Sequence, residues 1–134
     1  NWQPHPCFAA VSADHWRGEY FNNEALNGQP AMVRDDGNAN LFFDWRGQSP
    51  ASACDVLANG GSVRWSRRVP FGSGAYRFEI TAGAGARVFV DGKLQFDRWN
   101  GEASGRFDLQ LGAGNHQLVF EIRGGANTPV SLRW

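Results

Sequence analysis

The fold is decided by one stretch of the chain, Arg87–Trp99, which reads RVFVDGKLQFDRW. Val88 and Val90 stand at alternate positions before the central Asp91-Gly92 pair, and apolar residues alternate again after it. An Asp-Gly pair between two alternating runs is a strong hairpin signal, because both turn positions favour a positive φ. The stretch therefore predicts two antiparallel strands joined by a tight turn.

The pattern of this hairpin recurs along the chain and predicts an all-β protein. A chain of 134 residues makes one domain, and its 17 glycines and 13% aromatic residues suit short strands separated by turns. We expect an antiparallel β-sandwich of jelly-roll type over residues 14–134, preceded by an extended N-terminal arm over residues 1–13. Long loops are expected at Asn22–Asn40 and Gly47–Gly61. The expected strands are Trp16–Phe21, Leu41–Arg46, Ser62–Pro70, Ala75–Thr81, Arg87–Val90, Leu94–Asp97, Gly105–Leu111, Gln117–Arg123 and Val130–Trp134.

A set of short segments, taken in chain order, resembles one known family. The segments are His15–Asn23, Leu26–Pro30, Val33–Asp36, Leu41–Trp45, Ser62–Trp65, Gly74–Phe78, the hairpin, Leu111–His116 and Ser131–Trp134. They are similar to the protective-antigen-type module of the anthrax protective antigen, yeast flocculins, epithelial adhesins and some bacterial β-glucosidases. The resemblance implies the sandwich fold and a module that accompanies glycosidases without performing their chemistry. One fold hosts many functions, so function has to be argued from sites.

Charge and motif content exclude several classes of function. The 13 acidic and 13 basic residues cancel, and no basic cluster marks a nucleic-acid partner. No apolar run approaches the length of about 18 residues that indicates a membrane-spanning helix. His5, His15 and His116 are scattered, and no nucleophile-elbow motif is present. We therefore expect a non-catalytic protein without a cofactor and rank a secreted enzyme last.

The two cysteines indicate the kind of cellular compartment in which the protein works. Cys7 and Cys54 lie far apart in the sequence and fit no zinc-binding spacing. The two cysteines either form a disulfide or remain as two buried thiols, and their even count favours the disulfide. A disulfide closing this loop contributes about 3–4 kcal/mol in the chain-entropy model and indicates an oxidising compartment. Together with the extracellular character of the family, it predicts a secreted, extracellular or cell-surface protein.

Calcium is the cation that the resemblance implies. In flocculins and adhesins of the family, two consecutive Asp residues before the hairpin hold Ca²⁺, which grips sugar hydroxyls. The matching positions here are Gly83-Ala84, within the run Ala82–Ala86, which has no side-chain oxygen. A hard cation needs oxygen ligands, usually with carboxylates among them. Asp35-Asp36 matches a different part of the family pattern, where Asp caps a turn, so we predict no metal site.

Sugar contacts implied by the resemblance fall on few residues. The family's second sugar-contacting loop matches Arg123–Thr128, where Arg123 and Asn127 carry hydrogen-bonding groups, and Asp91 in the hairpin turn is the third candidate. The alternative for this loop is a flexible, solvated connection. Aromatic positions that recur in the family are expected to pack in the core and not to stack on sugars; they are Trp16, Trp45, Trp65, Trp99 and Trp134.

Two functions remain, and they differ in where the protein makes its contacts. We rank first a self-associating structural or adhesive subunit of an extracellular homo-oligomer or filament, whose arm docks on a neighbouring copy through Trp2 and Phe8. An extended, proline-bearing segment suits addition to a sheet edge. The alternative for the arm is packing onto its own sandwich beside Cys7. The second function is a calcium-independent, lectin-like carbohydrate-binding module.

Overall fold

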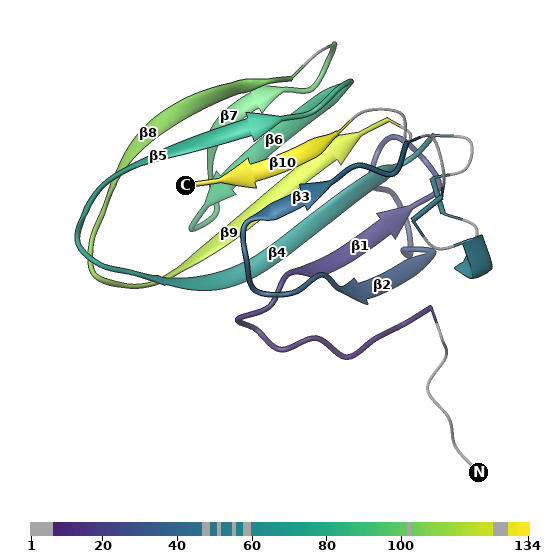
Figure 1. The fold of residues 1–134 in the computed structure, drawn as a ribbon, viewed down its shortest axis with the longest axis horizontal. Coiled ribbons are helices and arrows are strands. Elements are labelled where there is room, and N and C mark those ends of the chain that lie inside the picture. Colours follow the sequence, from purple (N-terminus) through teal and green to yellow (C-terminus); the bar gives the residue numbers. More distant parts are fainter. Residues whose placement is uncertain are drawn as a thin grey trace.

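Two antiparallel sheets pack face to face in the computed structural model, which confirms the β-sandwich (Figure 1). The structure describes residues 7–46, 49–50, 52–54, 56–57, 60–101, 103–124 and 129–134. One sheet has the strand order β2-β1-β4-β9-β6-β7, and the other has the order β3-β10-β5-β8. The elements are β1 (Arg17–Phe21), β2 (Met32–Asp35), β3 (Leu41–Phe43), η1 (Ser52–Cys54), β4 (Ser62–Phe71), β5 (Gly74–Thr81), β6 (Gly85–Val90), β7 (Lys93–Arg98), β8 (Gly105–Leu111), β9 (Gly114–Arg123) and β10 (Val130–Arg133).

Every strand expected from the sequence is present, and one further strand, β2, was not predicted. β2 lies inside the stretch Asn22–Asn40, which the sequence indicates as a loop. Its four residues are too few to show alternation, and its two apolar residues, Met32 and Val33, are both buried. β2 therefore depends on pairing with β1, in which Met32 lies opposite Tyr20, and the local pattern does not reveal it.

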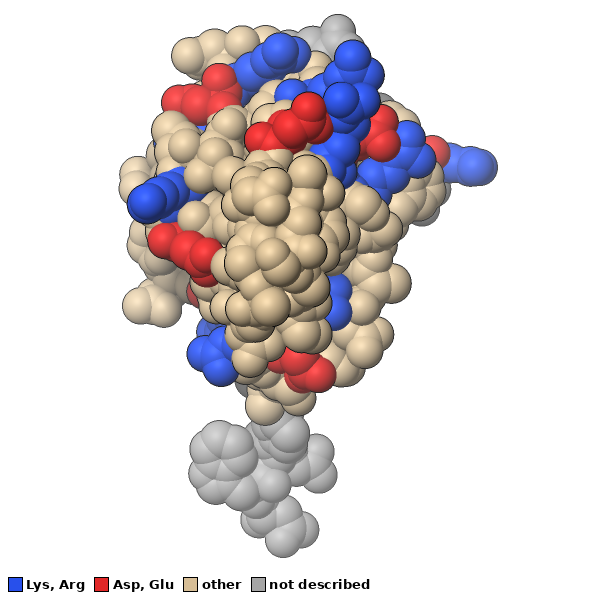
Figure 2. All heavy atoms as spheres, turned by 90° about the vertical axis from the view of Figure 1, so that its left-hand side faces the viewer, with Lys and Arg blue, Asp and Glu red and all other residues tan. Residues whose placement is uncertain are grey.

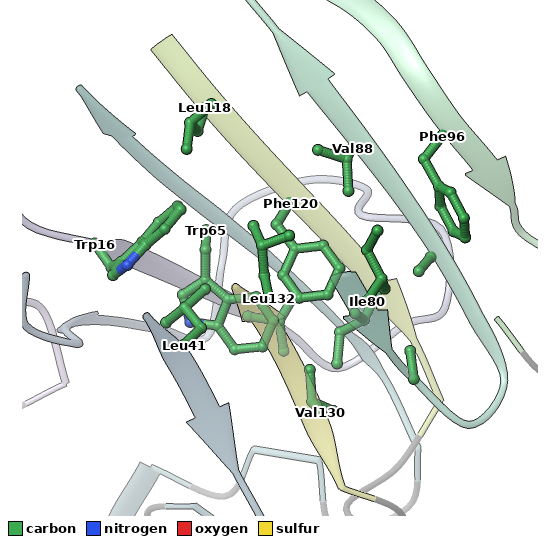
Figure 3. Packing of buried hydrophobic residues seen from close by; sticks show 14 of the residues in the cluster. Trp16, Leu41, Trp65, Ile80, Val88, Phe96, Leu118, Phe120, Val130 and Leu132 are labelled. Atoms are coloured by element: carbon green, nitrogen blue, oxygen red, sulfur yellow. The ribbon is translucent and has the colours of Figure 1, made fainter. Parts of the chain in front are cut away.

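The core lies between the sheets and is built around the two long central strands, β4 and β9 (Figure 3). Trp65 of β4 and Phe120 of β9 occupy paired positions, and their ring centroids are 5.5 Å apart. Val63 and Leu118 extend the same buried face. Because side chains alternate along a strand, this face is continuous while the opposite face of the sheet carries polar groups.

Four of the five described tryptophans agree with the expectation that these residues pack in the core. Trp16 and Trp65 are fully buried, and Trp45 and Trp134 are partly buried against the core. Trp99 differs, because its ring lies beneath the guanidinium of Arg87 at 3.9 Å. The described tryptophans therefore serve packing, and none of them is an exposed platform for a sugar ring.

The described part of the N-terminal arm lies along the edge of its own sheet. Val33 of β2 donates its N–H to the carbonyl of Cys7 at 2.8 Å, and Ala9 donates to the carbonyl of Val33 at 2.9 Å. Phe8 forms a parallel bridge with Val33, and a disulfide joins Cys7 to Cys54. The arm thus covers a strand edge that would otherwise offer unpaired backbone groups. Trp2 lies outside the described residues.

The two ends of the sandwich differ in their connections. The turn end carries the tight β4–β5, β6–β7 and β8–β9 connections, of which the first and last lie at the left of Figure 1. In the β6–β7 turn, φ is 51° at Asp91 and 80° at Gly92, as the Asp-Gly pair predicts. The loop end carries the connections that follow β1, β5, β7 and β9. Within the described residues, no helix is long and apolar enough to cross a membrane.

Candidate functional site

A hollow lies at the turn end, between the β6–β7 hairpin and the β8–β9 turn, with a cavity volume of about 230 Å³. Figure 2 faces the end of the molecule where the β8–β9 turn lies, and uncharged residues fill the middle of this view. The hollow combines hydrogen-bonding side chains with aliphatic ones. It is lined by Val90, Asp91, Lys93, Gln95, Leu109, Gln110, Leu111, Gly112 and His116.

His116 joins the two turns that border the hollow. Its Nδ1 atom lies 2.6 Å from Oδ2 of Asp91, and its Nε2 atom lies 2.7 Å from the carbonyl oxygen of Gly112. A carboxylate and a carbonyl only accept hydrogen bonds, so the imidazolium, in which both nitrogens donate, satisfies both contacts together. The hydrogen bond to Asp91, followed by the one to Gly112, raises the pKa of His116. The protonated form of His116 therefore makes both contacts, and the Asp91–His116 pair is a clasp between the two turns that border the hollow.

Asp91 is held through both of its carboxylate oxygens. Oδ1 accepts a hydrogen bond from the backbone N–H of Gln117 at 2.9 Å, while Oδ2 faces His116. The His116 contact, followed by the Gln117 contact, lowers the pKa of Asp91. The side chain of Asp91 is nevertheless 47% exposed, and a carboxylate has about four lone-pair sites. Asp91 can therefore order the turn and still accept a hydrogen bond from a ligand.

The other walls of the hollow offer neutral and cationic donors. Gln95 of β7, Gln110 of β8 and Lys93 also line the hollow; a Gln side chain carries an amide that can donate and accept, and a Lys side chain carries an ammonium group. Leu109 and Leu111 of β8 are aliphatic lining residues, and Leu111 is buried. Ligand sites for small molecules typically pair a mostly apolar surface with a few placed polar groups. The arrangement suits a neutral, polyhydroxylated ligand with an apolar face.

The three residues predicted from the sequence to contact a sugar do not form one site. Asp91 lines the hollow at the turn end, whereas Arg123 ends β9 at the loop end. The register pairs Val90 with Leu118 and Gly85 with Arg123, which separates Leu118 from Arg123 by five residues. At a rise of about 3.4 Å per residue, this spacing is about 17 Å. Asn127 lies outside the described residues.

Arg123 makes its contacts within its own chain. Its Nε atom donates to the carbonyl of Trp99 at 2.8 Å, and Nη2 donates to the carbonyl of Ala84 at 3.4 Å. Its Nη1 atom lies 3.8 Å from Oε1 of Glu24. A guanidinium thus lies against the loop where the resemblance implies calcium. The described residues do not fit the ion, since Gly83 and Ala84 bear no side-chain oxygen.

Asp36, the second member of the other aspartate pair, belongs to a buried polar cluster. Its Oδ2 atom accepts hydrogen bonds from the hydroxyl of Tyr20 at 2.7 Å and from Nε1 of Trp65 at 2.8 Å. Arg34 bonds to its other oxygen, and the Asp36 side chain is only 3% exposed. A Cβ at Gly18 would collide with Oδ2. The cluster is closely packed and its role is structural.

Sequence reasoning did not identify Gln95, Gln110 or His116 as members of a site. Gln95 and Gln110 lie on strands that are not paired with each other, and they border one hollow only because the two sheets pack together. His116 and Asp91 are 25 positions apart. The one available signal was that the Asp91-Gly92 turn and His116 both stand at strand ends.

Residues 16–125 match the PA14 domain, and the chain belongs to this family. It is similar to the anti-sigma-I factor RsgI3 of Acetivibrio thermocellus, with 32% identity over 96 residues that cover 71% of this chain and 14% of that protein. A solved anti-sigma factor domain-containing protein from Clostridium clariflavum has a TM-score of 0.69 and 28% identity, covering 89% of this chain and 40% of that one. This chain therefore spans less than half the length of each.

A third relative is the PA14 sugar-binding domain from an RTX adhesin. It has a TM-score of 0.63 and 13% identity, and the match covers 91% of this chain and 88% of that one. At this identity the likeness concerns the fold alone. The family match and these structures confirm the resemblance to the protective-antigen-type module and the sandwich it implies.

Proposed function

We propose that this PA14 domain is a non-catalytic module that works outside the cell and binds carbohydrate without calcium. The observation that carries the proposal is the hollow at the turn end, which is lined by Gln95 and Gln110 and by an aliphatic wall of Leu109 and Leu111. Sugars present hydroxyl groups around an apolar face of C–H bonds, which such a wall complements. The volume of about 230 Å³ suits one sugar unit at the end of a saccharide.

Two further observations support the proposal. The RTX adhesin domain, which has the same fold, is a sugar-binding domain, and the two anti-sigma relatives are regulatory proteins of which this module resembles one part. The Cys7–Cys54 disulfide suits an oxidising, extracellular compartment. In this proposal the domain senses or anchors a saccharide, and chemistry on that saccharide is left to other proteins.

The test is calorimetric titration with a panel of soluble oligosaccharides, in the presence of EDTA and again with added calcium. Gln95→Ala and Gln110→Ala should each weaken binding about tenfold, which corresponds to about 1.4 kcal/mol. Gln29→Ala is the matched control, because Gln29 is an exposed glutamine away from the hollow. Binding that requires calcium, or binding that neither glutamine variant weakens, would contradict the proposal.

A second candidate function is the self-association ranked first from the sequence. The observation that favours it is Phe42 of β3, which is 68% exposed on an edge strand of the four-stranded sheet. Exposed apolar side chains on a strand edge favour pairing with another chain. The predicted docking of the arm on a neighbouring copy stays a prediction, and the described residues of the arm lie on β2 of the same chain.

A further inference from the structure

We infer that Arg123 is a built-in cation at the loop end: its guanidinium joins three loops and makes their arrangement independent of bound calcium. The proposal does not depend on sugar binding at the turn end. Its first support is the set of atoms around the guanidinium, namely the carbonyls of Ala84 and Trp99 and the carboxylate of Glu24. These atoms belong to the connections that follow β5, β7 and β1, respectively.

Backbone carbonyls and a carboxylate are the ligand types that a hard cation selects. Oxygens of this kind, brought together from separate loops, repel one another unless a positive group lies between them. Arg supplies that charge with five N–H donors in a rigid fork, so it can bond several oxygens at once. The distances of 2.8, 3.4 and 3.8 Å from Nε, Nη2 and Nη1 show each nitrogen directed to a different loop.

The backbone around Arg123 is shaped for this close approach. A Cβ at Gly85 would collide with the carbonyl oxygen of Trp99 and would lie 3.2 Å from Nε of Arg123. Any side chain at this position would therefore displace the carbonyl that Arg123 binds. Gly124 has a φ of +111°, and a Cβ there would lie 2.9 Å from Cβ of Ala84. Glycine at both positions keeps the loop after β5 within reach of the guanidinium.

The base of the side chain is well anchored. Arg123 ends β9, which is paired on one side with β4 and on the other with β6, so its Cα position is fixed by two neighbours. Trp99 is held from a second direction, because Arg87 lies over its ring at 3.9 Å. The Arg123 side chain is 26% exposed, which leaves its charge only partly solvated. A second cation placed beside it would be repelled.

The test replaces Arg123 in the whole chain and follows the loops directly. Arg123→Ala should lower Tm by about 5 °C or more, and it should speed amide hydrogen exchange at residues 82–86 and 99–103 at least tenfold, with little change in the central strands. Arg123→Lys should recover part of the protection, since an ammonium group can reach only some of the three oxygens. Added calcium or EDTA should leave the Tm of the parent unchanged.

Arg133→Ala is the matched control, because Arg133 is 65% exposed and its ion pair with Glu79 lies on the outer face of the four-stranded sheet. It should leave both Tm and loop exchange near the parent values. The inference is overturned if amide hydrogen exchange at these loops is as slow in Arg123→Ala as in the parent. It is also overturned if the loss of protection spreads evenly over the sandwich, or if calcium stabilises the parent. None of these readouts involves a sugar, so the two proposals can fail separately.

Discussion

At the scale of single residues, the charge on His116 makes stability depend on pH. The hydrogen bond to Asp91 places the pKa of His116 above its ordinary value of about 6.5. Its contribution to folding is therefore complete below about pH 6.5 and is lost as pH rises through the folded-state pKa. The pH dependence that comes from Asp91 has the opposite sign, because its pKa is lowered. Its contribution to stability is present above about pH 3.9 and is lost as pH falls through the folded-state pKa.

The first prediction is that His116→Gln removes the loss of stability that accompanies a rise in pH above about 6.5. Urea denaturation of parent and variant at a series of pH values measures it. Asp91→Asn tests whether the Asp91 carboxylate causes the raised pKa of His116. Without that carboxylate, the pKa of His116 measured by NMR should move back toward its ordinary value. If the unfolding free energies of the parent and of His116→Gln change with pH in parallel, the Asp91–His116 clasp contributes nothing to the pH dependence of stability.

At the scale of elements, the outer face of the six-stranded sheet is held by charge pairs between its central strands. Glu121 of β9 is only 6% exposed and lies between Arg64 of β4 and Arg87 of β6, with Nε–O distances of 2.9 and 3.2 Å. The register places Glu121 directly opposite both arginines. Loss of this carboxylate would leave two cations facing each other across β9, so the pairs favour this register.

The second prediction concerns the arm, which the Cys7–Cys54 disulfide ties to η1 and which pairs with β2 through backbone hydrogen bonds. The bond spans 47 residues, and in the chain-entropy model a loop of this size contributes about 4 kcal/mol. Replacing both cysteines by serine should lower the unfolding free energy by a comparable amount in urea denaturation.

Hydrogen exchange separates a local effect of this substitution from a global one. The amide of Val33, which donates to Cys7, should lose protection before the amides of β4 do. If the double variant keeps the stability of the parent and its Val33 amide stays protected, the disulfide does not hold the arm on β2.

At the scale of the whole molecule, self-association is open to a direct test. Sedimentation velocity over a range of concentrations should show assembly of the full chain, and removal of residues 1–6 with Cys7 retained should abolish that assembly if Trp2 anchors it. Phe42→Ser is the comparison variant, because Phe42 is 68% exposed on an edge strand away from the arm. A parent that stays monomeric throughout rules out self-association, and a truncated form that assembles normally rules out the arm.

The sequence by itself determined the parts of this protein that depend on neighbouring residues. The alternation about Asp91-Gly92 indicated the β6–β7 hairpin, and the same period of two indicated the strands β5, β8 and β9. The ordered series of motifs indicated the family. Side-chain alternation along a strand is a local property, so it can be read without knowledge of the partner strand.

Only the tertiary structure decided which distant residues meet. β2 is too short for alternation to reveal, and it exists through its pairing with β1 and the arm. The Asp91–His116 clasp, the hollow beside it and the reach of Arg123 to Trp99 depend on register between strands separated by loops. A shift of one residue in any strand would turn its side chains to the other face. Register is a property of the packed sandwich, and no segment of the chain specifies it alone.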